Sequence, residues 1–222
     1  MILRLLLVLV IVGATPARAH EIPRVDEEFI KGAFTPSFVP PAPGTYELPV
    51  VSRVGAFVLR DTAGRRVSTS AVMAGKVAVV SFIYTACAER LGCPLASAAL
   101  RQLQSRLRDE GLAGEAVLLT ISFDAERDTP AQLAKYAHAF GADPALWRFM
   151  AAPDARVLDG LLRSYGQDRA PVHDERGRFT GRYRHVLKVF LVDRDARVRN
   201  VYSTGFLVPQ VVLNDIKTVL GP

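Results

Sequence analysis

The chain has 222 residues but only two cysteines, Cys87 and Cys93, so any thiol chemistry must use this one pair. It also lacks a run of basic residues: 28 Lys and Arg against 22 Asp and Glu give a net charge of +6, and the arginines are scattered singly. This pattern argues against nucleic acid as a partner and leaves an acidic partner surface possible. No Ser-His-Asp order and no phosphate-binding loop is evident, so the sequence does not indicate a hydrolase or a nucleotide-binding protein.

A segment long enough to cross a membrane is lacking as well. The apolar run at 5–14 has 10 residues, whereas a bilayer needs about 20. Arg4 precedes this run and Ala17-Arg18-Ala19 follows it as a small-residue cleavage site. We therefore predict that residues 1–19 are a cleaved secretory signal peptide, with an uncleaved membrane anchor as the alternative. We expect export to a bacterial periplasm, where cysteine pairs can be oxidised.

Removal of residues 1–19 would delete Arg4 and Arg18 and leave 203 residues with a net charge of +4. That length is enough for one domain with a proper core, and no internal repeat or low-complexity tract divides it. Residues 20–50 are rich in proline, which predicts an extended arm lying over the domain. Residues 51–222 would then form the folded domain.

The two cysteines flank a change in the periodicity of the sequence. Residues 77–84 are almost all apolar, with many β-branched and aromatic types, which predicts a strand buried on both faces. From Pro94 onward the apolar residues fall on one helical face, and a proline suits the first turn of a helix. Cys87 is therefore expected in the turn after a central strand. Cys93 is expected at about the N-cap of the next helix, where the helix dipole should favour its thiolate.

The Cys-x5-Cys spacing leaves three interpretations open. On one continuous helix the two side chains would point to different faces, so residues 87–92 must form a loop if the sulfurs are to converge. Gly92 supplies backbone freedom for such a loop. The pair can then form a reversible disulfide or present two thiolates to a soft metal ion. A structural disulfide is the third interpretation, although so short a loop adds little closure entropy.

The remaining pattern alternates strands with helices. Asp128 or Thr129 is expected to cap the second helix, with Pro130 in its first turn. This order argues for an α/β sheet with helices on both faces and an active centre at the carboxyl end of a central strand, where Cys87 lies. The other expected elements are a hairpin of 54–59 and 66–68, strands at 116–123 and 147–150, helices at 131–140, 154–165 and 208–220, a long loop at 166–184, and a second hairpin of 186–192 and 197–203.

With a cysteine pair between the first central strand and its helix, this order resembles the thioredoxin fold. Within that fold the chain is similar to the SCO (SenC) copper chaperones of cytochrome oxidase assembly. The resemblance implies an α/β, thioredoxin-like fold with a central mixed sheet, helices on both faces and an N-terminal hairpin extension. The matching segments cover nearly the whole domain in order: FIYTAC at 82–87, CP at 93–94, ISFDAERDTP at 121–130, WRFM at 147–150, YG at 165–166 and RHVLKVFLVDRDARV at 184–198.

The resemblance also implies a function. In that family two cysteines and a late histidine bind copper, which implies Cys87, Cys93 and His185 as the metal ligands here. Thiolates select Cu(I), an imidazole accepts Cu(I) or Cu(II), and three ligands leave an open position for handing the ion on. We therefore expect residues 51–222 to be the copper-binding domain of a periplasmic chaperone that delivers copper to a respiratory oxidase. Its partner would be a cytochrome oxidase subunit or another copper-transfer protein, and only that partner or an uncleaved signal would bring it to a membrane.

The chain departs from the family pattern at two places. The family spacing is Cys-x3-Cys, so this chain has two additional residues, and because Cys93 keeps its place before Pro94 we expect the surplus to bulge out beside Cys87. Arg184 stands where the family usually has an acidic residue before the histidine. A guanidinium there makes the local field less favourable for a cation.

Two other functions are compatible with the cysteine pair. One is a thiol-disulfide oxidoreductase, in which Cys87 and Cys93 would be the catalytic redox pair that reduces metal-ligand cysteines of a partner; the other is a copper or redox sensor that acts by docking. A general oxidoreductase would have Cys-x2-Cys and a cis-proline before the late strand, where this chain has Tyr183-Arg184-His185. A peroxidase of this fold would have Pro-x3-Thr-x2-Cys, and Val80 and Tyr84 occupy those positions. A metallochaperone is therefore favoured over an enzyme.

The remaining histidines have ordinary interpretations and one specific hypothesis. His138 is expected on a helix surface, and His173 in the long loop, from which it could swing toward copper. If cleavage follows Ala19, the free α-amine and the imidazole of His20 could together chelate Cu(II). The alternative is a disordered first residue.

Overall fold

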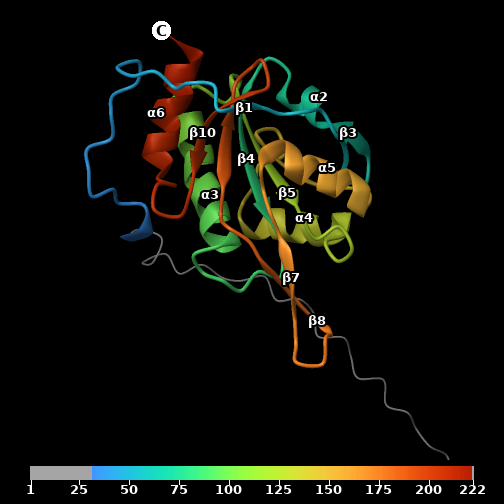
Figure 1. Ribbon diagram of the computed structural model, residues 1–222. Coiled ribbons are helices and arrows are strands. Elements are labelled where there is room, and N and C mark those ends of the chain that lie inside the picture. Colours follow the sequence, from blue (N-terminus) through green and yellow to red (C-terminus); the bar gives the residue numbers. More distant parts are fainter. Residues whose placement is uncertain (1–31, 222) are drawn as a thin grey trace, which may run out of the picture.

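The described part of the chain, residues 32–221 of a computed structural model, has one large sheet at its centre and a small hairpin that projects from one end (Figure 1). The helices are α2 (Thr69–Met73), α3 (Cys93–Asp109), α4 (Pro130–Ala139), α5 (Ala155–Tyr165) and α6 (Pro209–Leu220). The strands are β1 (Ser52–Arg53), β2 (Val58–Asp61), β3 (Arg66–Ser68), β4 (Val77–Ile83), β5 (Ala116–Ser122), β6 (Trp147–Ala151), β7 (Ala170–His173), β8 (Phe179–Arg184), β9 (Val189–Val192) and β10 (Arg197–Tyr202).

The large sheet is mixed and has the strand order β1-β10-β9-β4-β5-β6-β2-β3. Strands β4, β5 and β6 are parallel, and the other neighbours pair antiparallel. Every residue of β4 and β5 is buried, as their continuous apolar sequence predicts for strands covered on both faces. The carboxyl end of β4 therefore lies in the middle of the sheet, with the first cysteine four residues beyond it.

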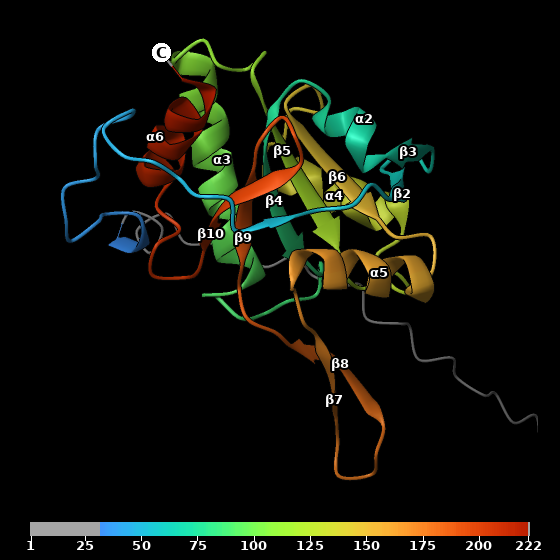
Figure 2. The ribbon, with the colours of Figure 1, turned by 45° about the horizontal axis from the view of Figure 1, so that its top comes forward.

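Helices cover both faces of this sheet, as Figure 2 shows. Helices α3 and α6 lie side by side, and α4 joins α3 through a buried hydrogen bond of 2.9 Å between the hydroxyls of Ser97 and Tyr136. Helix α5 covers the other face, where the ring of Tyr165 packs edge-on against Phe82 with centroids 5.2 Å apart. The predicted α/β thioredoxin-like class with a central mixed sheet is confirmed.

The N-terminal arm can be followed over the described residues only. Between residues 41 and 48 it crosses α6 and β10: Asn214 donates to the carbonyl of Pro41, and Tyr46 donates to Asp215 over 2.5 Å. Arg199 of β10 donates from Nε to the carbonyl of Leu48 over 2.8 Å. The predicted signal peptide at 1–19 and the first part of the predicted arm lie outside the described residues.

Three expectations about elements need correction. Residues 166–184 are not a loop, because β7 and β8 pair antiparallel within them. The first hairpin strand is β2 at 58–61 rather than 54–59, since Val54 pairs instead with the carbonyl of Ala196 beyond the short strand β1. Helix α2 was not expected.

Candidate metal centre

The two cysteines lie at the two ends of a tight loop between β4 and α3. The amide of Cys87 donates to the carbonyl of Tyr84 over 3.1 Å, and the amide of Gly92 donates to the carbonyl of Glu89 over 2.9 Å. Gly92 is the N-cap of α3 and Cys93 is its first residue, which agrees with the prediction that Cys93 lies at about the N-cap. A Cβ atom on Gly92 would lie 3.2 Å from the Glu89 carbonyl and 3.4 Å from Cys87 Sγ. Glycine is therefore needed here for close packing of the loop against the sulfur.

The structure brings Cys87, Cys93 and His185 together. One ligand atom from each lies within 4.8 Å of the others, and Cys93 Sγ is 3.8 Å from His185 Nε2. Both cysteines are buried and neither forms a disulfide, while His185 is half-buried. Two thiol sulfurs and one imidazole nitrogen form a donor set that suits soft ions such as Cu(I) and ions that bind imidazole well, such as Cu(II).

The two thiols differ sharply in acidity. A hydrogen bond from the Cys93 thiol, with smaller ones from His185 and the amides of Cys93 and Glu89, lowers the pKa of Cys87 to about 4 against the opposing effect of burial. Burial first, and then the neighbouring Cys87 sulfur, raise the pKa of Cys93 well above its ordinary value. The expected thiolate at Cys93 is therefore wrong: desolvation outweighs the helix dipole there, and the thiolate forms at Cys87.

Aromatic side chains hold the imidazole in place. The His185 ring packs edge-to-face on Phe123, with centroids 4.8 Å apart, and on Tyr84, with centroids 6.1 Å apart. Phe123 directly follows β5, and Tyr84 directly follows β4. The carboxyl ends of the two central parallel strands thus set the orientation in which His185 presents Nε2 to Cys93.

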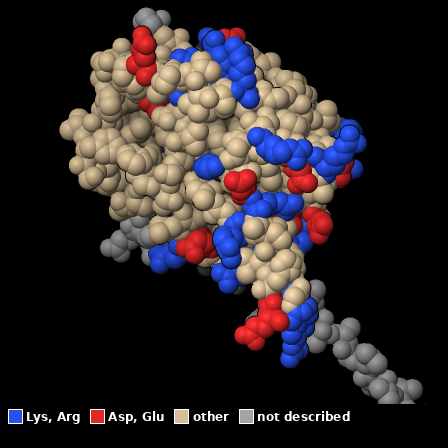
Figure 3. Space-filling view, in the orientation of Figure 1, with Lys and Arg blue, Asp and Glu red and all other residues tan. Residues whose placement is uncertain are grey.

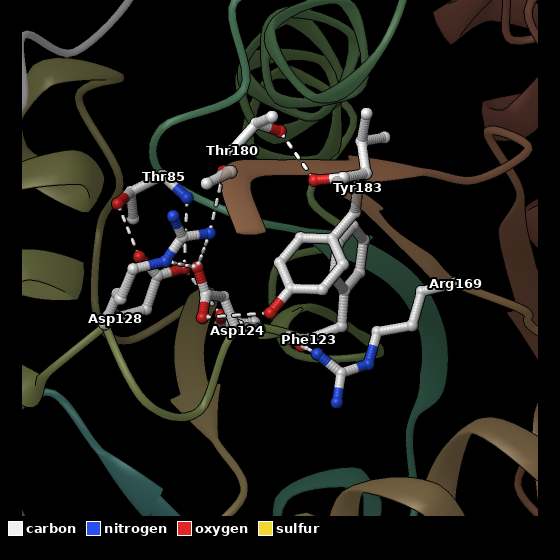
Figure 4. Close-up of polar contacts among 11 residues, drawn as sticks. Thr85, Phe123, Asp124, Asp128, Arg169, Thr180 and Tyr183 are labelled. Atoms are coloured by element: carbon white, nitrogen blue, oxygen red, sulfur yellow. Dashed lines mark hydrogen bonds and ion pairs between the residues drawn. The ribbon is translucent and has the colours of Figure 1, made fainter. Parts of the chain in front are cut away.

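A buried carboxylate fixes the turn that carries Cys87 (Figure 4). Asp128 accepts hydrogen bonds from the Thr85 amide (3.0 Å), the Thr85 hydroxyl (2.5 Å) and the Ser122 hydroxyl (2.6 Å). Burial raises the pKa of Asp128 despite these donors. Of the two candidate helix caps, only Thr129 accepts the capping bond, from the Gln132 amide, so Asp128 is free to join the ends of β4 and β5.

Two arginines attach the β7–β8 hairpin to the body of the protein. Arg127 forms an ion pair with Asp124, donates to the carbonyl of Gly181 over 2.8 Å and lies 4.8 Å over the ring of Phe179. Arg169 donates to the carbonyl of Phe123 over 2.6 Å and lies 4.9 Å over the ring of Tyr183, as Figure 4 shows. Because His185 follows β8 directly, these contacts also position the imidazole.

A cleft with a volume of about 960 Å³ opens between the cysteine loop and the hairpin. Cys87 and His185 line it, together with exposed Arg182 and Arg184 from β8, and Glu89 is its one acidic lining residue. Within residues 32–221, neither Arg182 nor Arg184 forms an ion pair. Figure 3 shows basic side chains on the hairpin and the neighbouring face, with acidic side chains interspersed among them.

The other histidines do not join this cluster. His138 is exposed on α4, and His173 is exposed on β7 with its ring 6.1 Å from that of Phe179. His20 lies outside the described residues. Sequence reasoning missed Asp128, Arg127 and Arg169 as residues that support the site. The alternation of Phe179, Gly181 and Tyr183 could have indicated β8, the strand that Arg127 and Arg169 hold against the body of the protein.

Proteins of the SCO1/SenC family are similar to this chain in sequence. The sequence model described as SCO1/SenC matches residues 49–221. A curated protein described as an SCO1 protein homolog, from Bacillus subtilis strain 168, is 26% identical over 172 residues, which are 77% of this chain and 84% of that protein.

Solved structures share the fold. The structure of Bradyrhizobium japonicum ScoI with copper bound has a TM-score of 0.62 and 24% identity, covering 76% of this chain and 99% of that one. The structure of BsSco, described in a study of its disulfide switch as a member of the Sco family of cytochrome c oxidase assembly proteins, has a TM-score of 0.62 and 24% identity. It covers 78% of this chain and 98% of that one.

Proposed function

Since this chain belongs to the SCO1/SenC family, we propose that it is a copper chaperone that binds the ion through Cys87, Cys93 and His185 and delivers it to the copper centre of a respiratory oxidase. The observation that carries the proposal is the convergence of two free thiols and an imidazole nitrogen within 4.8 Å. The copper-bound ScoI structure and the description of BsSco as an oxidase assembly protein support the cargo and the class of recipient.

The arrangement suits an ion that is held and then released. Cys87 is already a thiolate near neutral pH, so Cu(I) has a soft ligand at the mouth of the site. Binding to the second sulfur requires Cys93 to give up its proton, which the positive charge of the ion promotes. The cleft leaves one side of the three ligands open. A cysteine of the recipient can bind the ion there before the ligands of this protein let go, so the ion never enters water.

We place this activity in the periplasm, on the sequence signal at residues 1–19. Within residues 32–221, none of the helices has the length and apolarity needed to span a bilayer. Mass analysis of the exported protein tests the location: a first residue of His20 in a periplasmic fraction supports it, and a chain that retains residues 1–19 contradicts cleavage.

Copper titration of the reduced protein tests the function. We expect one Cu(I) per chain, lost on Cys87→Ala, Cys93→Ala or His185→Ala, because each change leaves the ion two protein ligands. His138→Ala is the matched control, since His138 is exposed on α4 and outside the cluster. Retention of stoichiometric Cu(I) by His185→Ala would contradict the proposed three-ligand site.

A thiol reductant of the recipient's cysteines is the second candidate, favoured by the lowered pKa of Cys87. The Cys87 thiolate would attack the partner's disulfide and release one partner thiolate, which takes up the proton of Cys93. Cys93 would then attack Cys87 and release the second partner thiolate, so the partner gains two electrons and this protein ends with a Cys87–Cys93 disulfide. Such a reductant needs both cysteines and tolerates His185→Ala, which separates it from the chaperone.

A further inference from the structure

The loop between the two cysteines carries a carboxylate that the proposed three-ligand site leaves unused. We propose that Glu89 is a fourth ligand that joins Cys87, Cys93 and His185 when the bound ion is Cu(II) and is not needed for Cu(I). The inference rests on the proposed function, because it assumes that copper occupies this site. It gives the longer Cys-x5-Cys connection a role: residues 88–92 bring in an oxygen donor.

The position of Glu89 places its side chain within reach of the ion. Glu89 lies two residues after Cys87, and its carbonyl accepts a hydrogen bond of 2.9 Å from the amide of Gly92, the residue before Cys93, so the backbone of residue 89 lies within the turn between the two proposed sulfur ligands. A Cβ built on Gly92 would lie 3.4 Å from Glu89 Cβ and 3.4 Å from Cys87 Sγ. Glu89 Cβ and Cys87 Sγ can therefore be no farther apart than twice this distance. The residue is exposed and lines the cleft, so its carboxylate can turn inward without displacing packed side chains.

The other nearby carboxylates are already engaged. Asp124 is ion-paired with Arg127, and Asp128 is buried and accepts three hydrogen bonds from Thr85 and Ser122. Glu89 forms no ion pair and no side-chain hydrogen bond within residues 32–221. It is therefore the one acidic group of the cleft that can move to an incoming ion.

The chemistry of the two copper ions makes this ligand selective. Two sulfurs and one imidazole complete a three-coordinate Cu(I) site, whereas Cu(II) prefers four ligands in a tetragonal arrangement and accepts oxygen donors well. The anionic oxygen also gains more from the doubly charged ion than from Cu(I). The other charged residues that line the cleft are Arg127, which is paired with Asp124, and Arg182 and Arg184, which repel both ions. Glu89 should therefore stabilise Cu(II) and lower the reduction potential of the bound ion.

The test compares Glu89→Gln with the wild type and with Glu175→Gln, which makes the same charge change at an exposed residue of the hairpin turn. The reduced proteins are titrated with Cu(I) and with Cu(II) against competing chelators, and the Cu(II) forms are examined by electron paramagnetic resonance. Glu89→Gln should lose about tenfold or more in Cu(II) affinity, by comparison with the loss of groups around metal ligands. Its Cu(I) affinity should stay unchanged and its copper hyperfine splitting should shift.

A tenfold selective loss of Cu(II) affinity corresponds to a rise of about 59 mV in the reduction potential of the one-electron couple. Equal losses of Cu(I) and Cu(II) affinity with an unchanged resonance spectrum would show a general charge effect and overturn the inference. A Glu89→Gln variant that matches Glu175→Gln in every measurement would overturn it as well. If the wild type binds neither ion, the proposed copper function fails first, and this outcome is visible before any variant is compared.

Discussion

Removing the carboxylate of Asp128 should both destabilise the fold and weaken the metal centre. In Asp128→Ala the Thr85 amide loses its buried partner, at a cost of about 1–3 kcal/mol, and two hydroxyls lose hydrogen bonds of about 1 kcal/mol each. We therefore expect the free energy of unfolding to fall by about 4 kcal/mol. Since Thr85 lies two residues before Cys87, copper affinity should fall by about tenfold as well, as for groups that orient ligands.

Asp128→Asn separates the shape of this network from its charge. The amide oxygen can still accept from the Thr85 amide and the Ser122 hydroxyl, and the amide NH₂ can donate to the Thr85 hydroxyl, which then acts as the acceptor. Burial disfavours the charged carboxylate at this position, which limits what a neutral amide loses. The expected cost is about 1 kcal/mol.

Urea unfolding of the reduced, metal-free proteins measures these differences, with equal m-values as the sign that the unfolded states are alike. Asp159→Ala, at an exposed site on α5, is the matched control and should change stability by no more than about 0.5 kcal/mol. The reasoning is refuted if Asp128→Ala costs less than about 1 kcal/mol or if Asp128→Asn is as damaging as Asp128→Ala.

Three further predictions follow from the same loop and hairpin. In the reduced apo protein, the pKa of Cys87 is lowered from 9.0 to about 4, so the ionised Cys87 thiol stabilises the fold fully above pH 9, and this stabilisation is lost as the pH falls through 4. Thiolate absorbance should show one thiolate per chain titrating near pH 4, and a midpoint near 9 would contradict this prediction. Gly92→Ala should cost about 1 kcal/mol or more and weaken copper binding, because its Cβ would press on the Glu89 carbonyl and Cys87 Sγ, whereas Gly114→Ala, with open space around it, should not; equal copper affinities would count against the close packing. Arg127→Lys should speed amide hydrogen exchange in the β7–β8 hairpin by about tenfold, because lysine cannot combine the ion pair with Asp124, the hydrogen bond to the Gly181 carbonyl and the contact with the Phe179 ring. Unchanged protection of the hairpin, measured by mass spectrometry, would show that Arg127 does not hold it in place.

The sequence predicted the central strands and the cysteine loop well because their signals are local. The apolar run of β4 and the proline after Cys93 each have one structural interpretation, and both hold. His185 is distant in the sequence from Cys87 and Cys93, so the convergence of all three proposed ligands could be expected only from the order of the elements and the family resemblance. The structure supplies the distances.

The hairpin and the acidity of the cysteines could not be read in the same way. Strands β7 and β8 bury little of their surface, so they lack the apolar pattern that identifies the strands of the main sheet. Arg127 and Arg169, from outside those strands, hold the hairpin through ring and carbonyl contacts that have no signature in the local sequence. The thiolate was assigned to the wrong cysteine because the burial of Cys93 depends on the packing of α3, which the helix-dipole argument ignores.

The three proposed ligands stand on supports of unequal stiffness. Both cysteines are buried in the segment that connects β4 to α3, whereas His185 directly follows the projecting β7–β8 hairpin (Figure 1). A partner that docked on the β7–β8 hairpin would therefore lie beside the imidazole donor, across the cleft from the cysteine loop.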